Sequence, residues 1–97
     1  MKYHSQAFSL EQNFPNPAST TTAISFSLKK AGYASLNIAD VTGRTLIAAA
    51  EQYFTEGEHT LNFDVANLAA GIYTYELSFT SASGQTQRIS RTLAIVR

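Results

Sequence analysis

Apolar and polar residues alternate along most of this chain, and this alternation constrains the fold more than any other feature. Between Tyr73 and Phe79 every second residue is apolar, and the residues between them are polar. Successive side chains of a strand point to opposite faces of a sheet, so this pattern predicts a strand with one buried face. Similar apolar stretches occur near residues 8–10, 24–28, 36–38, 45–50, 61–63 and 89–96.

Turn-forming residues separate these stretches. Two prolines lie in the segment 13–17, and Gly43, Gly71 and Gly84 each lie in a short connecting segment. About seven short strands with this punctuation predict an antiparallel β-sandwich or barrel. The residues that share one phase of the alternation are expected to be buried between two sheets: Leu36, Ile38, Phe63, Tyr75 and Leu77.

Residues 47–54 are the ambiguous part of the pattern. They include Ala48, Ala49, Ala50, Glu51 and Gln52, and several of these are good helix formers. The segment is short and flanked by strands, so it is interpreted as a strand with a connection, and a helical turn is the alternative. A turn is expected at 55–58.

The composition indicates one domain without disulfides. The chain has 97 residues, no cysteine, and seven basic and seven acidic side chains with a net charge of zero. A neutral chain of this length has no electrostatic footprint for nucleic acid. No apolar run approaches the length of a membrane-spanning helix. Met1–Gln6 lacks the apolar core of a signal peptide, so residues 1–7 are interpreted as a linker remnant or as residues added ahead of the domain, poorly ordered in either case.

The last part of the chain is basic. From Gly84 onward the charged residues are Arg88, Arg91 and Arg97. One interpretation is a strand with solvated arginines. The other is a docking surface for an acidic partner, which could read the apolar residues of a terminal strand by strand addition.

The residues offer little for catalysis or metal binding. His59 lies near Glu56 and Glu58, but adjacent strand residues point to opposite faces and no further ligand has suitable spacing. It is therefore expected in a solvated turn. No phosphate loop or nucleophile motif is present, so we expect neither an enzyme nor a cofactor. An adhesive or carbohydrate-binding module is the alternative function, with Tyr33, Tyr53 and Phe54 as its candidate exposed aromatics and the Tyr53–Phe54 pair as the best of them.

Four segments occur in a fixed order along the chain: Leu10–Pro17 with Thr21–Ile24, Leu36–Arg44, Leu68–Leu77 and Arg91–Arg97. Together they resemble one family, the type A C-terminal sorting domain of the bacterial type IX secretion system. The resemblance spans residues 8–97 and departs from the family pattern at Ala39 and Arg91, where an aromatic residue and a lysine are frequent. Segments of a flagellar-hook-cap immunoglobulin-like domain look similar in part.

The resemblance implies an immunoglobulin-like fold over residues 8–97 and a place at the end of a larger cargo protein. It implies passage through the periplasm and across the outer membrane to the cell surface or the medium. The implied partners are the secretion machinery and a sortase that removes the domain. An open sheet edge at the first or last strand also suggests a weak homodimer.

Each motif of the resemblance has a structural explanation beside its sorting role. The prolines can end a connection, the Asp-x-x-Gly segment can form a hairpin turn, and the Gly-Ile-Tyr segment can begin a core strand. The candidate sorting residues are Pro15, Asn16, Pro17, Asp40, Gly43, Gly71, Ile72, Tyr73, Arg91, Leu93 and Arg97.

Overall fold

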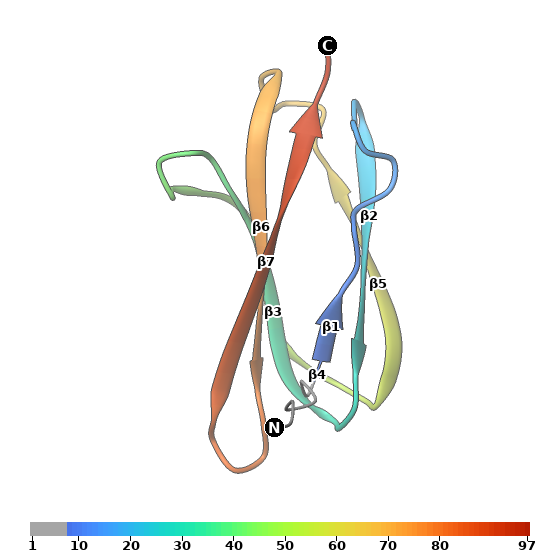
Figure 1. The fold of residues 1–97 in the computed structure, drawn as a ribbon, viewed down its shortest axis with the longest axis vertical. Coiled ribbons are helices and arrows are strands. Elements are labelled where there is room, and N and C mark those ends of the chain that lie inside the picture. The colour runs from blue at the N-terminus through green and yellow to red at the C-terminus, as the bar shows by residue number, and fades with distance from the viewer. Residues whose placement is uncertain (1–7) are drawn as a thin grey trace, which may run out of the picture.

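A computed structural model describes residues 8–97 as two packed β-sheets (Figure 1). The described residues form seven strands and no helix, as the alternation predicts. The expected disorder of Met1–Gln6 lies outside the described residues. The strands are β1 (Phe8–Leu10), β2 (Thr21–Leu28), β3 (Gly32–Ala39), β4 (Thr45–Phe54), β5 (Gly57–Asp64), β6 (Gly71–Thr80) and β7 (Thr86–Ile95).

All strand pairs within the two sheets are antiparallel. One sheet has the order β1-β2-β5 and the other has the order β4-β3-β6-β7. β2 and β3 follow each other in the chain but belong to different sheets, which makes the two layers one sandwich. β1 and β7 lie at one side of the sandwich, where the two sheets come into contact. This arrangement confirms the predicted immunoglobulin-like sandwich.

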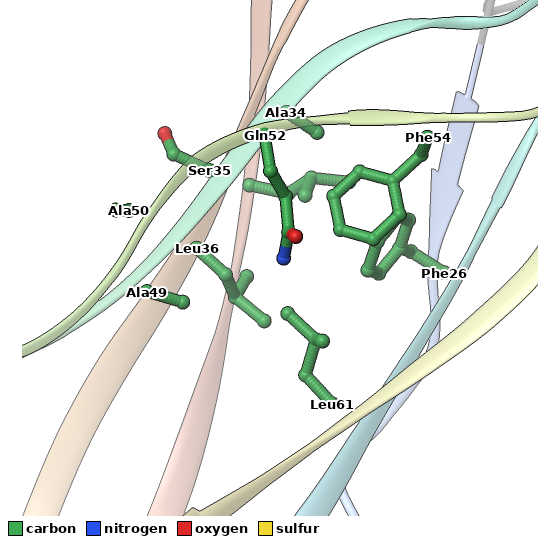
Figure 2. A pocket seen from close by; sticks show the side chains of 10 residues that line it. Phe26, Ala34, Ser35, Leu36, Ala49, Ala50, Gln52, Phe54 and Leu61 are labelled. Carbon is green, nitrogen blue, oxygen red and sulfur yellow. The ribbon is translucent and has the colours of Figure 1, made fainter.

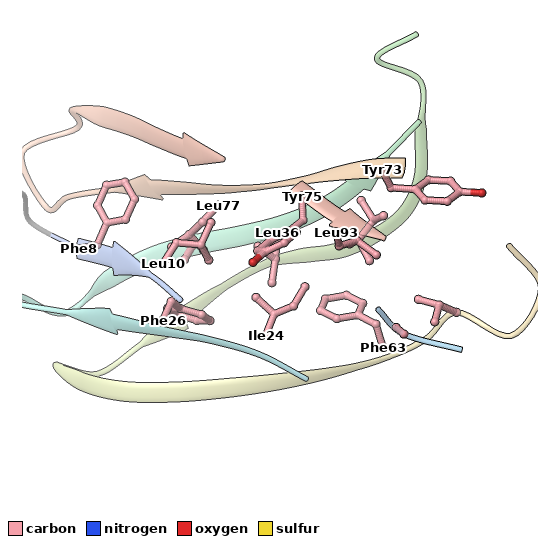
Figure 3. Packing of buried hydrophobic residues seen from close by; sticks show 14 of the residues in the cluster. Phe8, Leu10, Ile24, Phe26, Leu36, Phe63, Tyr73, Tyr75, Leu77 and Leu93 are labelled. Atoms are coloured by element: carbon pink, nitrogen blue, oxygen red, sulfur yellow. The ribbon is translucent and has the colours of Figure 1, made fainter. Parts of the chain in front are cut away.

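The core lies between the two sheets and is built by the alternating residues of their inner faces (Figure 3). Burial of each large apolar side chain contributes roughly 1.5–3 kcal/mol to folding. The five residues predicted to be buried are confirmed, since none is more than 6% exposed: Leu36, Ile38, Phe63, Tyr75 and Leu77.

The structure resolves residues 47–54 as part of a strand, so the alternative of a helical turn is wrong. β4 pairs with β3, with Ile47 opposite Ile38 and Tyr53 opposite Tyr33. The helix propensity of the alanines is overridden because pairing with β3 places Ile47 and Ala49 against the core. Extra residues in β4 shift the register twice, which marks β-bulges in this edge strand.

Candidate functional site

The proline-containing segment after β1 lies along the end of β7. The Asn16 side-chain Oδ1 accepts a hydrogen bond from the Ala94 N–H at 3.1 Å. The Ala18 N–H donates to the Ala94 carbonyl at 2.8 Å, and the Val96 N–H donates to the Ala18 carbonyl at 2.9 Å. A parallel bridge joins Ala18 to Ile95. The segment therefore covers the outer backbone edge of the last residues of β7.

Two buried polar side chains hold this segment in place. Asn13 and Thr22 are 2% and 1% exposed, and the Asn13 Nδ2 donates to the Thr22 Oγ1 at 2.9 Å. Both side chains also donate to the Pro15 carbonyl, at 3.1 Å and 3.2 Å. The Gln12 side chain donates to the Thr92 carbonyl at 2.9 Å, which ties the segment to β7 a second time. Burial of satisfied polar groups specifies one conformation of the loop.

The three residues of the Pro-Asn-Pro motif are themselves exposed. The peptide bonds before Pro15 and Pro17 are both cis. The structural role predicted for the prolines is consistent with this position, because they lie in the connection and not within a central strand. Their exposure also leaves Pro15, Asn16 and Pro17 accessible to a partner.

Arg91 and Leu93 lie on the same face of β7, but Arg91 is exposed and Leu93 is buried. The Arg91 Nε donates to the Leu10 carbonyl at 2.7 Å and so joins β7 to β1 across the side of the sandwich. Arg91 pairs with Tyr75 in the neighbouring strand. Leu93 is fully buried in the core. A partner that reads the folded domain therefore has no direct access to the Leu93 side chain.

Arg97 is exposed, and its guanidinium donates hydrogen bonds to several backbone carbonyls. Its guanidinium donates to the Leu68 carbonyl through Nε at 3.0 Å and through Nη2 at 2.6 Å. Nη2 also donates to the carbonyls of Val65 at 2.6 Å and Ala66 at 3.0 Å. Nη1 donates to the Ser19 carbonyl. One side chain thus ties the end of the chain to the β5–β6 connection and to the segment before β2.

The Gly-Ile-Tyr segment begins β6 beside the end of β7. Gly71 has a φ of 155° and pairs with Ile95. Ile72 is 54% exposed on the outer face of the sheet. Tyr73 is 7% exposed on the inner face, and its hydroxyl donates to the Ala69 carbonyl at 2.6 Å. The segment therefore combines one exposed apolar residue with a core tyrosine that anchors the preceding loop.

Asp40 and Gly43 form the predicted hairpin turn, which joins β3 to β4 and projects from the sandwich (Figure 1). The Asp40 Oδ1 accepts from the Thr42 hydroxyl at 2.6 Å, the Thr42 N–H at 2.9 Å and the Arg44 N–H at 3.1 Å. The hydrogen bond from the Thr42 hydroxyl, with further hydrogen bonds and the nearby Arg44, lowers the pKa of Asp40. Gly43 has a φ of 89°, a conformation that favours glycine.

The structure thus brings together three of the four sequence segments. The Pro-Asn-Pro segment, the Gly-Ile-Tyr segment and the end of β7 meet through the backbone pairs and side-chain hydrogen bonds above, and we call them the terminal cluster. The Asp40–Gly43 turn does not share these hydrogen bonds. The cluster also depends on four residues that were not predicted as site residues: Gln12, Asn13, Thr22 and Ala18. Only their position within or beside the first motif could have pointed to them.

Two of the three candidate aromatics of the alternative function lie together on the surface, and the third does not. Tyr33 and Tyr53 are 51% and 58% exposed, and their ring centroids lie 5.3 Å apart. Phe54 instead packs edge-on against Phe26 at 5.1 Å and close to His59 at 4.9 Å. The prediction of a joint Tyr53–Phe54 surface is wrong, because adjacent residues of β4 point to opposite faces.

His59 lies within β5 and not in a solvated turn, and its ring hydrogen-bonds the Thr55 carbonyl at 2.7 Å. Beside Phe54, the side chains of Gln52 and Leu61 close the gap between the sheets (Figure 2). These side chains leave no room for a water molecule in the gap.

Among residues 8–97, no three His, Cys, Asp or Glu side chains are grouped in a way that could hold a metal ion. Within the same residues, no helix has the length and apolar character needed to cross a membrane.

The fold and the terminal cluster define an immunoglobulin-like β-sandwich whose last strand is tied to its first connection. Residues 12–91 match the family of the secretion system C-terminal sorting domain, and the chain belongs to this family. No curated protein sequence matches the chain.

Two solved structures show the same fold. Dimeric latent PorU from Porphyromonas gingivalis is similar at 16% identity with a TM-score of 0.76, over 92% of this chain and 9% of the PorU chain. CopC from Methylosinus trichosporium OB3b is similar at 21% identity with a TM-score of 0.60, over 91% of this chain and 92% of CopC. The chain thus spans a small part of PorU and nearly all of CopC.

Proposed function

We propose that this domain is a non-catalytic sorting signal that directs a larger cargo protein through the periplasm and across the outer membrane by the type IX secretion system. A sortase then removes the domain, and the cargo reaches the cell surface or the medium. Membership in the sorting-domain family supports this role. The observation that carries it further is the terminal cluster, in which three of the segments typical of the family form one surface.

The exposed members of the terminal cluster are the residues that we propose the secretion machinery reads. Ile72 and Val96 are 54% and 46% exposed although both are apolar. Ile72 lies opposite Ala94, and Val96 follows Ala94 by two residues, directly after the end of β7. The exposed Pro-Asn-Pro segment borders the same strand end. Leu93, Tyr73 and Gly71 act by shaping this surface.

Export of a reporter protein carrying this domain at its C-terminus tests the proposal. Deletion of Leu93–Arg97 also removes core residues. Loss of export after that deletion can therefore come from unfolding of the domain as well as from loss of the recognised strand end. The double variant Ile72→Ser/Val96→Ser changes exposed sites, where effects on stability are usually within about 0.5 kcal/mol. We expect this variant to melt like the parent and to leave the reporter in the periplasm.

Tyr33→Ser is the matched control, because Tyr33 is equally exposed and lies at the far end of β3 from Ala39. The control reporter should reach the surface at the parent level. Normal surface delivery of the Ile72→Ser/Val96→Ser reporter would refute the proposed reading surface. Normal delivery after deletion of Leu93–Arg97 would refute the sorting role itself.

The proposal includes a weak homodimer through an open sheet edge. The similar PorU is described as dimeric. β1 has three residues, and the Pro-Asn-Pro segment covers the end of β7, so the stretch of β7 before Arg91 is the better edge of these two. Sedimentation at high micromolar concentration should show a dimer, and a monomer alone would remove this part of the proposal.

A further inference from the structure

We infer that the outer face of the β4-β3-β6-β7 sheet is a binding site for a glycan chain. This inference goes beyond the sorting role and does not depend on it. It rests on a hollow in this face, on the chemistry of the residues that line the hollow, and on a pair of exposed tyrosines in line with it.

The hollow has a volume of about 250 Å³ and opens on the outer face of the sheet. Its lining consists of short side chains and hydrogen-bonding groups from all four strands and the β3–β4 turn. Asn37 of β3 lies opposite Glu76 of β6, and Glu76 lies opposite Ser90 of β7. The remaining lining residues are Ala39, Gly43, Thr45 and Thr74.

The lining favours a polyhydroxylated ligand over an apolar one. Pockets for apolar small molecules are lined mostly by hydrophobic and aromatic side chains, and this hollow is not. The Asn37 amide both donates and accepts, and the Glu76 carboxylate accepts. Arg88 approaches Glu76 at 3.9 Å and adds donors beside it. Adjacent hydroxyl groups of a sugar both donate and accept, so they match such a mixed set.

A row of outward-facing residues along β3, here called the track, lies between the hollow and the tyrosine pair. Along β3, the outward-facing residues are Tyr33, Ser35, Asn37 and Ala39. Ser35 lies opposite Ser78 of β6, so the track between the tyrosines and the hollow carries short hydroxyl side chains. At about 3.3 Å per residue, Tyr33 and Asn37 lie about 13 Å apart along the strand. That span requires an oligosaccharide and not a single sugar.

The tyrosine pair provides the apolar contact that a sugar ring needs. The rings of Tyr33 and Tyr53 meet at an angle of 71° with their centroids 5.3 Å apart. The two rings pack edge to face, and both remain more than half exposed. A sugar has apolar C–H faces as well as hydroxyl edges. It can therefore pack on a ring here while its neighbours along the chain hydrogen-bond in the hollow.

The outer face of the other sheet provides an internal comparison. β2 and β5 also carry short polar side chains there, such as Ser25 and Thr60, which hydrogen-bond each other at 2.8 Å. Glu58 is an exposed carboxylate on this face. Phe14 is an exposed aromatic residue that lies opposite Ala23 of β2. These residues supply matched controls in a region outside the inferred site.

The test is a titration of the purified chain with soluble glucan, mannan and chitin oligosaccharides, followed by amide chemical shifts in NMR. We expect saturable shifts with at least one of them, centred on Tyr33, Asn37 and Glu76. Tyr33→Ala should weaken binding by about tenfold, because the sugar loses its aromatic partner. Glu76→Gln should weaken it as well, because the charged acceptor is lost.

Phe14→Ala and Glu58→Gln are the controls, and both should bind like the parent. All these substitutions are at exposed or half-exposed positions, and the amide spectrum reports directly that each variant is folded. Absence of saturable shifts with all three oligosaccharides would overturn the inference. Shifts that centre on β2 and β5, or that Phe14→Ala abolishes and Tyr33→Ala does not, would overturn it too.

Discussion

The backbone N–H of Asn13 donates a hydrogen bond to the Tyr75 hydroxyl at 2.9 Å, across 62 residues of sequence. The same hydroxyl donates to the Glu11 carbonyl at 2.8 Å. Tyr75 is fully buried in β6, so its hydroxyl is the polar end of a core side chain. These two hydrogen bonds attach the connection that carries the Pro-Asn-Pro motif to the opposite sheet.

Tyr75→Phe should therefore destabilise the domain through that connection. The variant keeps the aromatic ring but leaves the Asn13 N–H and the Glu11 carbonyl without their partner. An unsatisfied buried polar group costs about 1–3 kcal/mol. Chemical denaturation should show a loss of that size. Tyr33→Phe, which changes an exposed ring, is the control and should unfold like the parent. Equal stability of Tyr75→Phe and the parent would contradict the anchoring role.

The same hydroxyl should give the domain a dependence on alkaline pH. Burial raises the pKa of Tyr75 above its ordinary value of 10.0. The folded state therefore favours the protonated phenol, and this contribution to stability is fully present below pH 10.0. It is lost as the pH rises through the higher pKa of the folded state. The free energy of unfolding, measured from pH 8 to pH 12, should fall less steeply in Tyr75→Phe than in the parent.

The contribution of Asp40 to stability should depend on acidic pH. Its pKa is lowered from the ordinary 3.8, chiefly by the hydrogen bond from the Thr42 hydroxyl. The folded state thus favours the carboxylate, whose contribution is present above pH 3.8 and is lost as the pH falls through the lower folded pKa. NMR titration should find the Asp40 midpoint below 3.8.

Asp40→Asn should remove this acid sensitivity and lower the melting temperature at neutral pH. The amide retains one oxygen for the Thr42 and Arg44 N–H groups but loses the charge that strengthens those bonds. Glu56→Gln, in the exposed turn before β5, is the control for loss of one negative charge. An Asp40 midpoint at or above 3.8 would show that the turn does not stabilise the carboxylate.

Gly32 should tolerate no larger residue, because it begins β3 directly beneath an aromatic ring. A Cβ at this position would lie 2.7 Å and 2.8 Å from two ring atoms of Phe79 and 2.8 Å from the Thr80 carbonyl oxygen. Gly32→Ala should therefore destabilise the domain by about 1–3 kcal/mol. The double variant Gly32→Ala/Phe79→Leu lacks the clash with the ring. Its loss of stability should therefore be smaller than the sum of the losses in Gly32→Ala and Phe79→Leu. Strict additivity would contradict this packing argument.

The sequence predicted local order well and long-range contacts poorly, for a physical reason. The period-two pattern depends on which face of a strand is buried, so the inward positions of Leu36 and Tyr75 could be predicted without knowledge of the partner strands. The turn at Asp40 was predictable because its hydrogen bonds are local. The helix propensity of residues 48–50 left a helical turn open as the alternative, and pairing with β3 outweighs that propensity.

The terminal cluster could not be predicted in this way. Its contacts join Asn16 to Ala94 and Arg97 to Leu68, and a single sequence does not show which distant groups meet. Arginine is also ambiguous, because the same exposed side chain can bind water, a partner or carbonyls of its own fold. The sequence therefore left the terminal arginines open between solvated charges and a docking surface, and the structure gives Arg97 a third role.

The contacts of Arg97 predict a measurable contribution of this side chain to stability. Hydrogen bonds to charged donors are worth about 1.5–3 kcal/mol, and the exposure of Arg97 reduces the expected loss in Arg97→Ala to about 1 kcal/mol. The stability of Arg97→Lys should lie between that of Arg97→Ala and that of the parent, because an ammonium group lacks the planar fork that reaches several carbonyls at once. Arg88→Ala is the control: it loses an exposed ion pair with Glu76 at 3.9 Å, which contributes little. Thermal unfolding of the four proteins should rank the parent and Arg88→Ala above Arg97→Lys, and Arg97→Ala last. If Arg97→Ala unfolds at the same temperature as Arg88→Ala, water satisfies these carbonyls equally well, and Arg97 is available to a partner as a free charge.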